Sequence, residues 1–207
     1  MAQINIIPAS ADTFEDLSVF VGNPPFIVAE GLQVAYYAAQ GSVLPYSIRV
    51  STCPVRSDYP TLSSGSKSVG TYRKPPRNNF NKKGAVILRG SAGPDIDFAG
   101  VFYPAAVYNT KEKKFMVYYL GQRGGVFSIC LASGKEYNGL VKWGSVAGKA
   151  TAVVANPSGW VVNFSPIYAE YNKEEDMYKL GYECVNSPGG TVFSSWLSTS
   201  RDGYNFV

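Results

Sequence analysis

The sequence predicts an all-β fold of antiparallel, blade-like repeats, arranged as a partial or oligomer-completed β-propeller. Two observations predict this fold. A unit of short apolar strands and polar turns occurs three times along the chain of 207 residues. The composition is also rich in Tyr (15) and Phe (11), which favour strands, and in Gly (21) and Pro (13), which separate them. A β-sandwich stays open as the alternative, because regularly spaced short strands fit that architecture too.

The clearest copy of the unit begins with the apolar stretch 102–108 and turns at the polar residues 109–113. The Tyr-rich strand 115–119 that follows has apolar side chains on both faces, which is typical of a strand buried between two layers. After a glycine-rich turn at 121–125, a strand at 126–132 completes the unit.

A second copy at 164–203 repeats this order with a charged turn at 171–176, and a fainter copy occupies residues 24–51. Two further apolar segments, 85–88 and 151–155, lie where the outer fourth strand of a blade is expected. Because a single repeat of this kind cannot bury its apolar faces alone, we expect the blades to stack on one another.

We expect residues 1–24 to form an N-terminal arm and residues 25–207 to form a single all-β repeat domain. The best candidate for a helix, 12–20, is short. No run of 18 apolar residues predicts a membrane span, and the first residues lack the basic start and apolar core of a signal peptide. The compartment stays open, with a virion and the cytoplasm as the alternatives.

A basic insertion at about 55–84 separates the first two copies and largely overlaps a stretch (59–94) that contains no Asp or Glu. Such a loop attracts phosphate or acidic surfaces, or it keeps an aggregation-prone β protein soluble. Only Tyr72 and Phe80 could stack on bases there, so nucleic acid is not favoured as a partner. The basic residues of this patch are Lys67, Arg73, Lys74, Arg77, Lys82 and Lys83.

The absence of histidine excludes several chemistries. Without it, no Ser-His-Asp or Cys-His arrangement is possible, and zinc sites lose their usual nitrogen ligand. No phosphate-loop or dinucleotide motif occurs, so we expect neither a cofactor nor a metal. Cys53, Cys130 and Cys184 are widely spaced and are predicted to be free, buried thiols, with a single disulfide as the alternative.

The order of the strands and the Ser-Arg-Asp-Gly ending at 200–203 resemble the blades of five-bladed propeller glycoside hydrolases, in the arabinanase/xylosidase-like and invertase-like groups. The resemblance covers about residues 25–52 and 100–207 and concerns how blades are built. It implies a propeller fold, and in an active member it implies two carboxylates that meet at the propeller axis.

Few carboxylates could serve that chemistry. Asp95 and Asp97 lie just before the second repeat, a suitable position for an axial acid, and Glu170 is a further candidate. Glu183 is similar to the Glu of the Glu-Cys pair in invertase-like enzymes, although it follows a Tyr-rich strand and does not open a blade. The nucleophile motifs of the family, Asn-Asp-Pro-Asn-Gly and Arg-Asp-Pro, are absent, so an enzyme is not favoured.

The sequence therefore favours a non-enzymatic binding or structural module that acts as a subunit of a larger, virion-like assembly. Three blades do not close a ring and would expose two apolar sheet faces, so we expect protein partners or a homo-oligomer. Carbohydrate is a further expected ligand, because aromatic rings at propeller faces can stack on sugars. The alternative is a five-bladed propeller glycoside hydrolase acting on plant-type or microbial polysaccharide. The candidates for glycan contact are Tyr36, Tyr118, Tyr182 and Trp196.

Overall fold

Twelve strands and no helix make up the regular structure of the described part of the chain. No helix long and apolar enough to cross a membrane is found among these residues. The basic patch and most of the predicted N-terminal arm lie outside the described residues. The computed structural model describes residues 18–21, 26–40, 46–54, 85–91, 93–144, 149–154, 160–187 and 190–207.

The strands form three antiparallel sheets, named sheets 1, 2 and 3 in chain order. Sheet 1 has the order β1-β3-β4-β5, with β2 also paired to β3, and consists of β1 (Ser18–Val21), β2 (Ile27–Ala29), β3 (Leu32–Gln40), β4 (Ser47–Pro54) and β5 (Ala85–Ile87). Sheet 2 consists of β6 (Gly100–Asn109), β7 (Lys114–Arg123), β8 (Val126–Gly134) and β9 (Val141–Lys142). Sheet 3 consists of β10 (Val161–Asn172), β11 (Met177–Val185) and β12 (Phe193–Ser200).

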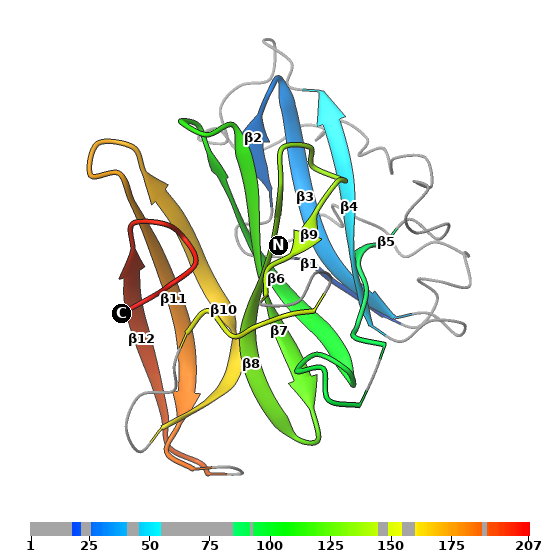
Figure 1. The fold of residues 1–207 in the computed structure, drawn as a ribbon, viewed down its shortest axis with the longest axis vertical. Coiled ribbons are helices and arrows are strands. Elements are labelled where there is room, and N and C mark those ends of the chain that lie inside the picture. The colour runs from blue at the N-terminus through cyan, green and yellow to red at the C-terminus, as the bar shows by residue number, and fades with distance from the viewer. Residues whose placement is uncertain are drawn as a thin grey trace, which may run out of the picture.

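The three sheets stand in a row with sheet 2 in the middle (Figure 1). An apolar cluster between sheets 2 and 3, called cluster 1, and another between sheets 1 and 2, called cluster 2, join them. Each sheet coincides with one copy of the repeat, so the prediction of an all-β fold of antiparallel, blade-like repeats is confirmed. Three stacked layers also distinguish the fold from the two-layer sandwich that was the alternative.

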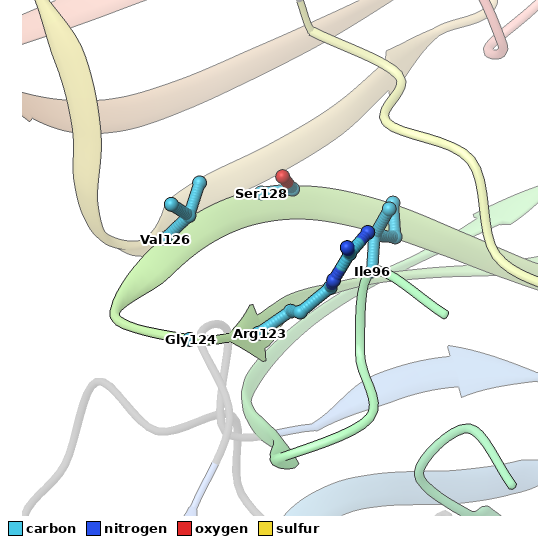
Figure 2. Close-up of a pocket in the computed structure, with 5 residues that line it drawn as sticks. All are labelled: Ile96, Arg123, Gly124, Val126 and Ser128. Atoms are coloured by element: carbon cyan, nitrogen blue, oxygen red, sulfur yellow. The ribbon is translucent and has the colours of Figure 1, made fainter. Parts of the chain in front are cut away.

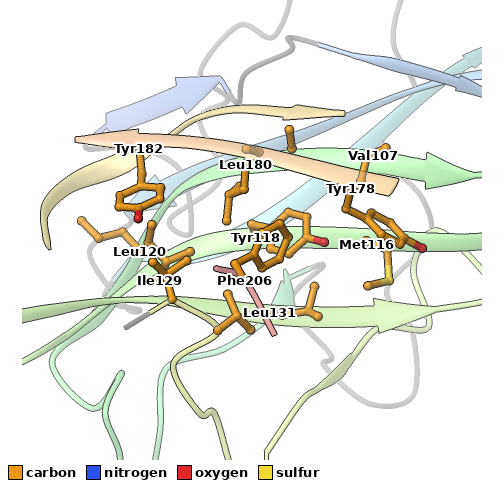
Figure 3. Packing of buried hydrophobic residues seen from close by; sticks show 14 of the residues in the cluster. Val107, Met116, Tyr118, Leu120, Ile129, Leu131, Tyr178, Leu180, Tyr182 and Phe206 are labelled. Atoms are coloured by element: carbon orange, nitrogen blue, oxygen red, sulfur yellow. The ribbon is translucent and has the colours of Figure 1, made fainter. Parts of the chain in front are cut away.

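Strand β7 shows why sheet 2 occupies the middle of the row. Successive side chains of a strand point to opposite faces, and in β7 both faces are apolar and fully buried. Figure 3 shows one face, where the β7 side chains meet Leu180 from β11. The two sets of β7 residues are Met116, Tyr118 and Leu120 in cluster 1, and Phe115, Val117 and Tyr119 in cluster 2.

The hairpins β6–β7 and β10–β11 contain the same turn. The asparagine that ends each first strand, Asn109 or Asn172, accepts hydrogen bonds from the backbone N–H groups two and three residues ahead, at 2.8–3.2 Å. The last turn residue, Lys113 or Asp176, has a left-handed φ of 52° or 49°. The recurrence of a turn with the same side-chain cap supports the repeat independently of the apolar pattern.

The outer strands differ in part from the prediction. Strand β5 lies within the expected segment 85–88, but the fourth strand of sheet 2 is β9 and not the segment 151–155. Ala152 makes only an isolated bridge to Cys130, and Val154 makes one to Phe206. The segment thus links sheet 2 to the end of the chain, a long-range role that local apolar content does not reveal.

Two local expectations were wrong. Residues 121–123 continue β7, so the glycine-rich turn is confined to Gly124 and Gly125, which have φ values of 55° and 80°. The segment 18–21, at the end of the helix candidate and within the predicted arm, is strand β1 and pairs with β3, because an open sheet edge outweighs weak helical propensity. Cys130 and Cys184 are free and buried as predicted, and the side chain of Cys53 lies outside the described residues.

The Ser-Arg-Asp-Gly motif and the residues after it fasten sheet 3 to sheet 2. The Tyr118 hydroxyl of β7 donates a buried hydrogen bond to the Gly203 carbonyl at 3.0 Å, and its ring meets the Phe206 ring edge-on at 5.5 Å. Gly203 has a φ of 74°, and a Cβ there would lie 2.9 Å from Cε of Met116 and 3.1 Å from the Tyr178 ring. Only glycine fits this position.

Asp202 holds the turn that presents Gly203. One carboxylate oxygen accepts the backbone N–H groups of Tyr204 and Asn205 and the Ser200 hydroxyl, at 2.7–2.9 Å. Partial burial raises the pKa of Asp202, but these hydrogen bonds outweigh it and bring the pKa well below its usual range.

We predict that Asp202→Asn destabilises the protein most at neutral pH and progressively less in acid. A carboxyl whose pKa is lowered by folding contributes stability above its unfolded pKa of about 3.9, and this contribution is lost as the pH falls toward the folded value. Urea denaturation of both proteins between about pH 7 and pH 3 measures the difference. Glu174→Gln, at an exposed turn position, is the control. A difference that is independent of pH would contradict the prediction.

Candidate functional site

Strands β6 and β10 are the first strands of sheets 2 and 3, and they contact each other. Both are irregular near a proline: the pairing register shifts between Phe102 and Ala105 in β6, and on either side of Pro166 in β10. Proline cannot donate to the ladder of hydrogen bonds, and a bulge re-aims the neighbouring side chains. The irregularity beside the proline of each repeat therefore changes the direction of the side chains in the first part of the strand.

Three aromatic residues, called the aromatic group, gather where β6 begins: Tyr46, Phe102 and Tyr103. The Phe102 ring centroid lies 4.6 Å from that of Tyr46 and 6.2 Å from that of Tyr103. Tyr103 is 36% exposed and has a left-handed φ of 43°, which is rare for a bulky residue and often marks a functional position. A Cβ at Gly100 would lie 2.6 Å from the Phe102 ring, so glycine is needed for this ring to lie against the backbone.

Two tryptophans form a second aromatic pair beside sheet 3. Trp160 precedes β10 and Trp196 lies in β12, and their ring centroids are 6.1 Å apart in an edge-to-face arrangement. Both are half-buried and pack, like Phe102, against cluster 1. The indole N–H of Trp196 is buried and has no hydrogen-bond partner in the described part of the chain. Trp196, a predicted glycan contact, therefore lies at the edge of the core with an unused donor.

Asp97, a candidate catalytic acid, lies between sheets 1 and 2 and is fully buried. Its Oδ2 accepts hydrogen bonds from Nζ of Lys142 at 2.6 Å and from the Tyr119 hydroxyl at 3.0 Å. Burial, followed by the nearby Cys130 and Asp97, holds the pKa of Tyr119 well above its usual range, so this hydroxyl stays a donor. A Cβ at Gly121 would lie 2.8 Å from Cβ of Asp97, which shows how tightly this side chain is enclosed.

Asp95, the neighbouring candidate, is nearly as enclosed. Asp95 is only 6% exposed, and its Oδ1 lies 3.4 Å from Nζ of Lys149. A Cβ at Gly90 would lie 2.4 Å from Cβ of Asp95 and 2.8 Å from Oδ1 of Asp97, so the two aspartates share one packed site. Burial, reinforced by Asp97, raises the pKa of Cys130 well above its usual range, so this thiol is not a nucleophile. The cluster joins the segment that connects β5 with β6 to strands β7 and β9 of sheet 2.

Glu183 and Glu170 lie elsewhere. Tyr182 and Cys184 point into cluster 1, so Glu183 between them points to the far face of sheet 3. Glu170, on the same face, accepts a hydrogen bond from the Tyr168 hydroxyl, which raises the pKa of Tyr168 to about 12. Sheets stack about 10 Å apart, so Asp97 and Glu183 are separated by roughly 20 Å. The two carboxylates of a glycosidase lie about 5–10 Å apart, so these candidates do not form a catalytic pair.

The tyrosines predicted to contact glycans are core residues. Tyr36, Tyr118 and Tyr182 are only 1–2% exposed, so they present no ring face to a sugar, and this corrects the expectation. Their hydroxyl groups bond within the protein, for example that of Tyr36 to the Tyr137 carbonyl at 2.7 Å and that of Tyr182 with Oγ of Ser198 at 3.1 Å. Tyr103, which the sequence pattern did not single out, is the most exposed ring of the aromatic group and lies directly before the repeat's proline.

A hollow of about 350 Å³ lies beside the β7–β8 hairpin (Figure 2). Arg123 crosses it and donates a hydrogen bond to the Pro94 carbonyl at 2.9 Å, while Ile96, Val126 and Ser128 complete the wall. Within the described residues, no three Asp, Glu or Cys side chains gather in a way that could hold a metal ion.

No protein-family model and no curated protein matches the chain, but solved structures do. The chain is similar to Zg3597, a family 117 glycoside hydrolase of the marine bacterium Zobellia galactanivorans, with a TM-score of 0.60 and 14% identity over 91% of this chain and 53% of that one. It is also similar to a thermostable family 43 glycoside hydrolase, with a TM-score of 0.51 and 12% identity over 95% and 53% of the two chains.

A third similar structure comes from the GH130 family of mannoside phosphorylases, described as containing glycoside hydrolases that target β-1,2 mannosidic linkages in Candida mannan. It matches with a TM-score of 0.54 and 13% identity over 94% of this chain and 52% of that one. The resemblance to glycoside hydrolase propellers is thus confirmed at the level of the fold. The chain spans about half the length of each of these proteins.

We predict that Lys142→Met destabilises the protein by about 3–5 kcal/mol, because it leaves the buried carboxylate of Asp97 without its cation. Urea denaturation followed by tryptophan fluorescence measures the loss. The double variant Asp97→Asn/Lys142→Met removes both charges and should recover most of the stability.

Lys111→Met is the matched control, because it breaks an exposed ion pair with Asp176, a type worth about 0–1 kcal/mol. If Lys142→Met cost no more than this control, the stability of the protein would not depend on the buried ion pair.

Proposed function

We propose that this protein is a non-catalytic, propeller-like module that binds carbohydrate through the aromatic group at the start of β6. The observation that carries the proposal is Tyr103, an exposed ring in a left-handed backbone conformation, supported by Phe102 and Tyr46. A sugar ring can stack on an aromatic face, and the tyrosine hydroxyl offers a donor and an acceptor to the sugar hydroxyls. Rigid aromatic side chains lose little entropy on binding, which suits a non-catalytic binding surface.

The placement of the carboxylates supports binding without hydrolysis. Strand β6 contains no Asp or Glu, and β10 contains only Glu170, near its far end. Asp95 and Asp97 are enclosed between sheets, and Glu183 lies on another face. A surface that retains aromatic rings but has no pair of accessible carboxylates can hold a sugar but cannot protonate and displace a glycosidic oxygen.

An assembly role is the second candidate. The far face of sheet 3 exposes large apolar side chains, including Leu197 at 63% and Phe193 at 52%. Exposed apolar surface on a sheet is typical of a contact with another protein. The similarities to solved structures concern the fold and do not bear on the expected place in a virus particle.

We predict that Tyr103→Ala abolishes or weakens carbohydrate binding by about tenfold or more, because it removes the stacking ring. An array of arabino-, xylo- and manno-oligosaccharides, followed by calorimetry on the best ligand, measures binding. Tyr103→Phe should retain most of the affinity, and Tyr168→Ala, at a comparably exposed tyrosine on another face, should leave it unchanged. Binding that survives Tyr103→Ala would place the ligand elsewhere, and an array without any bound sugar would contradict the proposal.

We also predict no turnover of aryl arabinosides, xylosides or mannosides above the uncatalysed rate, either by the protein or by its Glu183→Gln variant. The separation of roughly 20 Å between Asp97 and Glu183 is the physical reason. Turnover that Glu183→Gln eliminates would reverse this conclusion and restore the hydrolase alternative.

A further inference from the structure

The hollow beside the β7–β8 hairpin contains two polar side chains that the carbohydrate site at β6 does not use. Arg123 and Ser128 line it together with the apolar side chains of Ile96 and Val126, and its volume is about 350 Å³ (Figure 2). Gly124 also lines it, and a Cβ there would meet no atom within 4 Å, so the hollow is open on this side. Apolar walls with a few polar groups are typical of a site for a small ligand or for one unit of a larger one.

The guanidinium group of Arg123 is held across the hollow with most of its donors available. It donates one hydrogen bond, to the Pro94 carbonyl at 2.9 Å, which fixes the side chain against the segment before β6. Among the described residues, no carboxylate lies within ion-pair distance of Arg123. Arginine has five N–H donors in a planar fork that matches the geometry of a carboxylate. The hollow therefore contains a positioned cation that no described carboxylate engages.

Ser128 supplies the second polar group. In the part of the chain that the structure describes, its hydroxyl makes no hydrogen bond. A hydroxyl can donate to a carboxylate oxygen, and it can accept from the hydroxyl of a sugar. Val126 is 57% exposed, so an apolar surface beside these polar groups is also accessible to a ligand.

The charges around the hollow favour an anionic ligand. The carboxylates nearest to it in the sequence, Asp95 and Asp97, are 6% and 0% exposed. Each already contacts a lysine, Asp95 at 3.4 Å from Nζ of Lys149 and Asp97 at 2.6 Å from Nζ of Lys142. Because these carboxylates are paired and enclosed, they do not compensate the charge of Arg123. The net charge of the chain, +4, has the same sign and attracts anions over longer distances.

The hollow and the aromatic group lie at the same end of sheet 2. Strand β6 begins where β7 ends: Gly100 pairs with Gln122, and the Ala99 N–H donates to the Gln122 carbonyl at 2.8 Å. Tyr103 lies four residues beyond Ala99, which is roughly 13 Å along a strand. A short oligosaccharide can cover this distance, so a single ligand can contact both places.

We propose that Arg123 and Ser128 form a carboxylate subsite, and that the ligand of this protein is an acidic oligosaccharide that contains a uronate residue. This inference rests on the proposed function, because it assigns a chemical class to the ligand of the aromatic group. The guanidinium group holds the carboxylate through two parallel hydrogen bonds, and the Ser128 hydroxyl donates a third. The C–H groups of the sugar ring pack against Ile96 and Val126, while another sugar unit stacks on Tyr103.

Calorimetry with acidic oligosaccharides and their methyl esters tests the proposal. The probes are tri-galacturonate and a glucuronate-substituted xylo-oligosaccharide, each compared with its own methyl ester, which has the same sugars but no charge. We expect at least one acidic probe to bind about tenfold or more tightly than its ester at low salt, and this difference should shrink as the salt concentration rises. Equal affinities of acids and esters would overturn the proposal. Tighter binding of a sulfated galacto-oligosaccharide than of both uronates would overturn the assignment to a carboxylate.

Variants of the hollow identify the group that reads the charge. Arg123→Met should weaken binding of the acidic probe by about tenfold and leave binding of its ester unchanged. Arg123→Lys keeps the charge but loses the planar fork, so its affinity should be intermediate, and Ser128→Ala should have a smaller effect than Arg123→Met. Lys135→Met, at an exposed lysine just after the other end of β8, removes the same charge and is the matched control, without an expected effect. Far-UV circular dichroism confirms that each variant is folded.

Tyr103→Ala separates this inference from the proposed function. If it weakens binding of acids and esters alike while Arg123→Met has no effect, the proposed function holds and the carboxylate subsite is wrong. If Arg123→Met removes the preference for the acid while Tyr103→Ala has no effect, the subsite holds and the aromatic group is not the carbohydrate site. If no oligosaccharide binds, both are wrong.

Discussion

The structure depends on one constraint, the burial of sheet 2 on both of its faces. A strand such as β7, apolar at every position from 115 to 120, cannot face water on either side, so sheet 2 must have a sheet on each flank. Cluster 1 buries one face of sheet 2, and cluster 2 buries the other. The turn that ends at Gly203 and the hydrogen bond from Tyr118 to its carbonyl then fix sheet 3 in place, because an unpaired buried hydroxyl would be unfavourable.

The same constraint decides what the acidic residues can do. Asp97 is buried on the face of sheet 2 that contributes to cluster 2. A charge without a partner would cost several kcal/mol there, and Lys142 and Tyr119 donate hydrogen bonds to its carboxylate. These contacts leave Asp97 buried and paired, unable to approach a substrate. Asp97 therefore contributes to the packing of the blades and is not accessible for the chemistry of an axial acid.

The apolar pattern predicted the number of sheets and most strands, because strand alternation and turn residues are local properties. It also predicted the turns at 109–113 and 171–176, where asparagine caps the backbone. It failed where a partner far along the chain decides the outcome, as at β1, which completes a sheet edge, and at 151–154, which bridges to Phe206. Tyr36, Tyr118 and Tyr182 failed as glycan contacts for a related reason: periodicity identifies a face but not what covers it.

The proposed function rests on the separation of fold from chemistry. Blade construction needs apolar strands, capped turns and a glycine at the blade end, and all of these are present. Glycoside hydrolysis needs two accessible carboxylates at a defined separation, and Asp97 does not meet this requirement because it is fully buried. The bulge at Phe102 and Tyr103 directs aromatic rings, not acids, at the opening of β6. A fold does not by itself determine function, so the proposal rests on these few side chains at the start of β6, whose aromatic rings are suited to stacking.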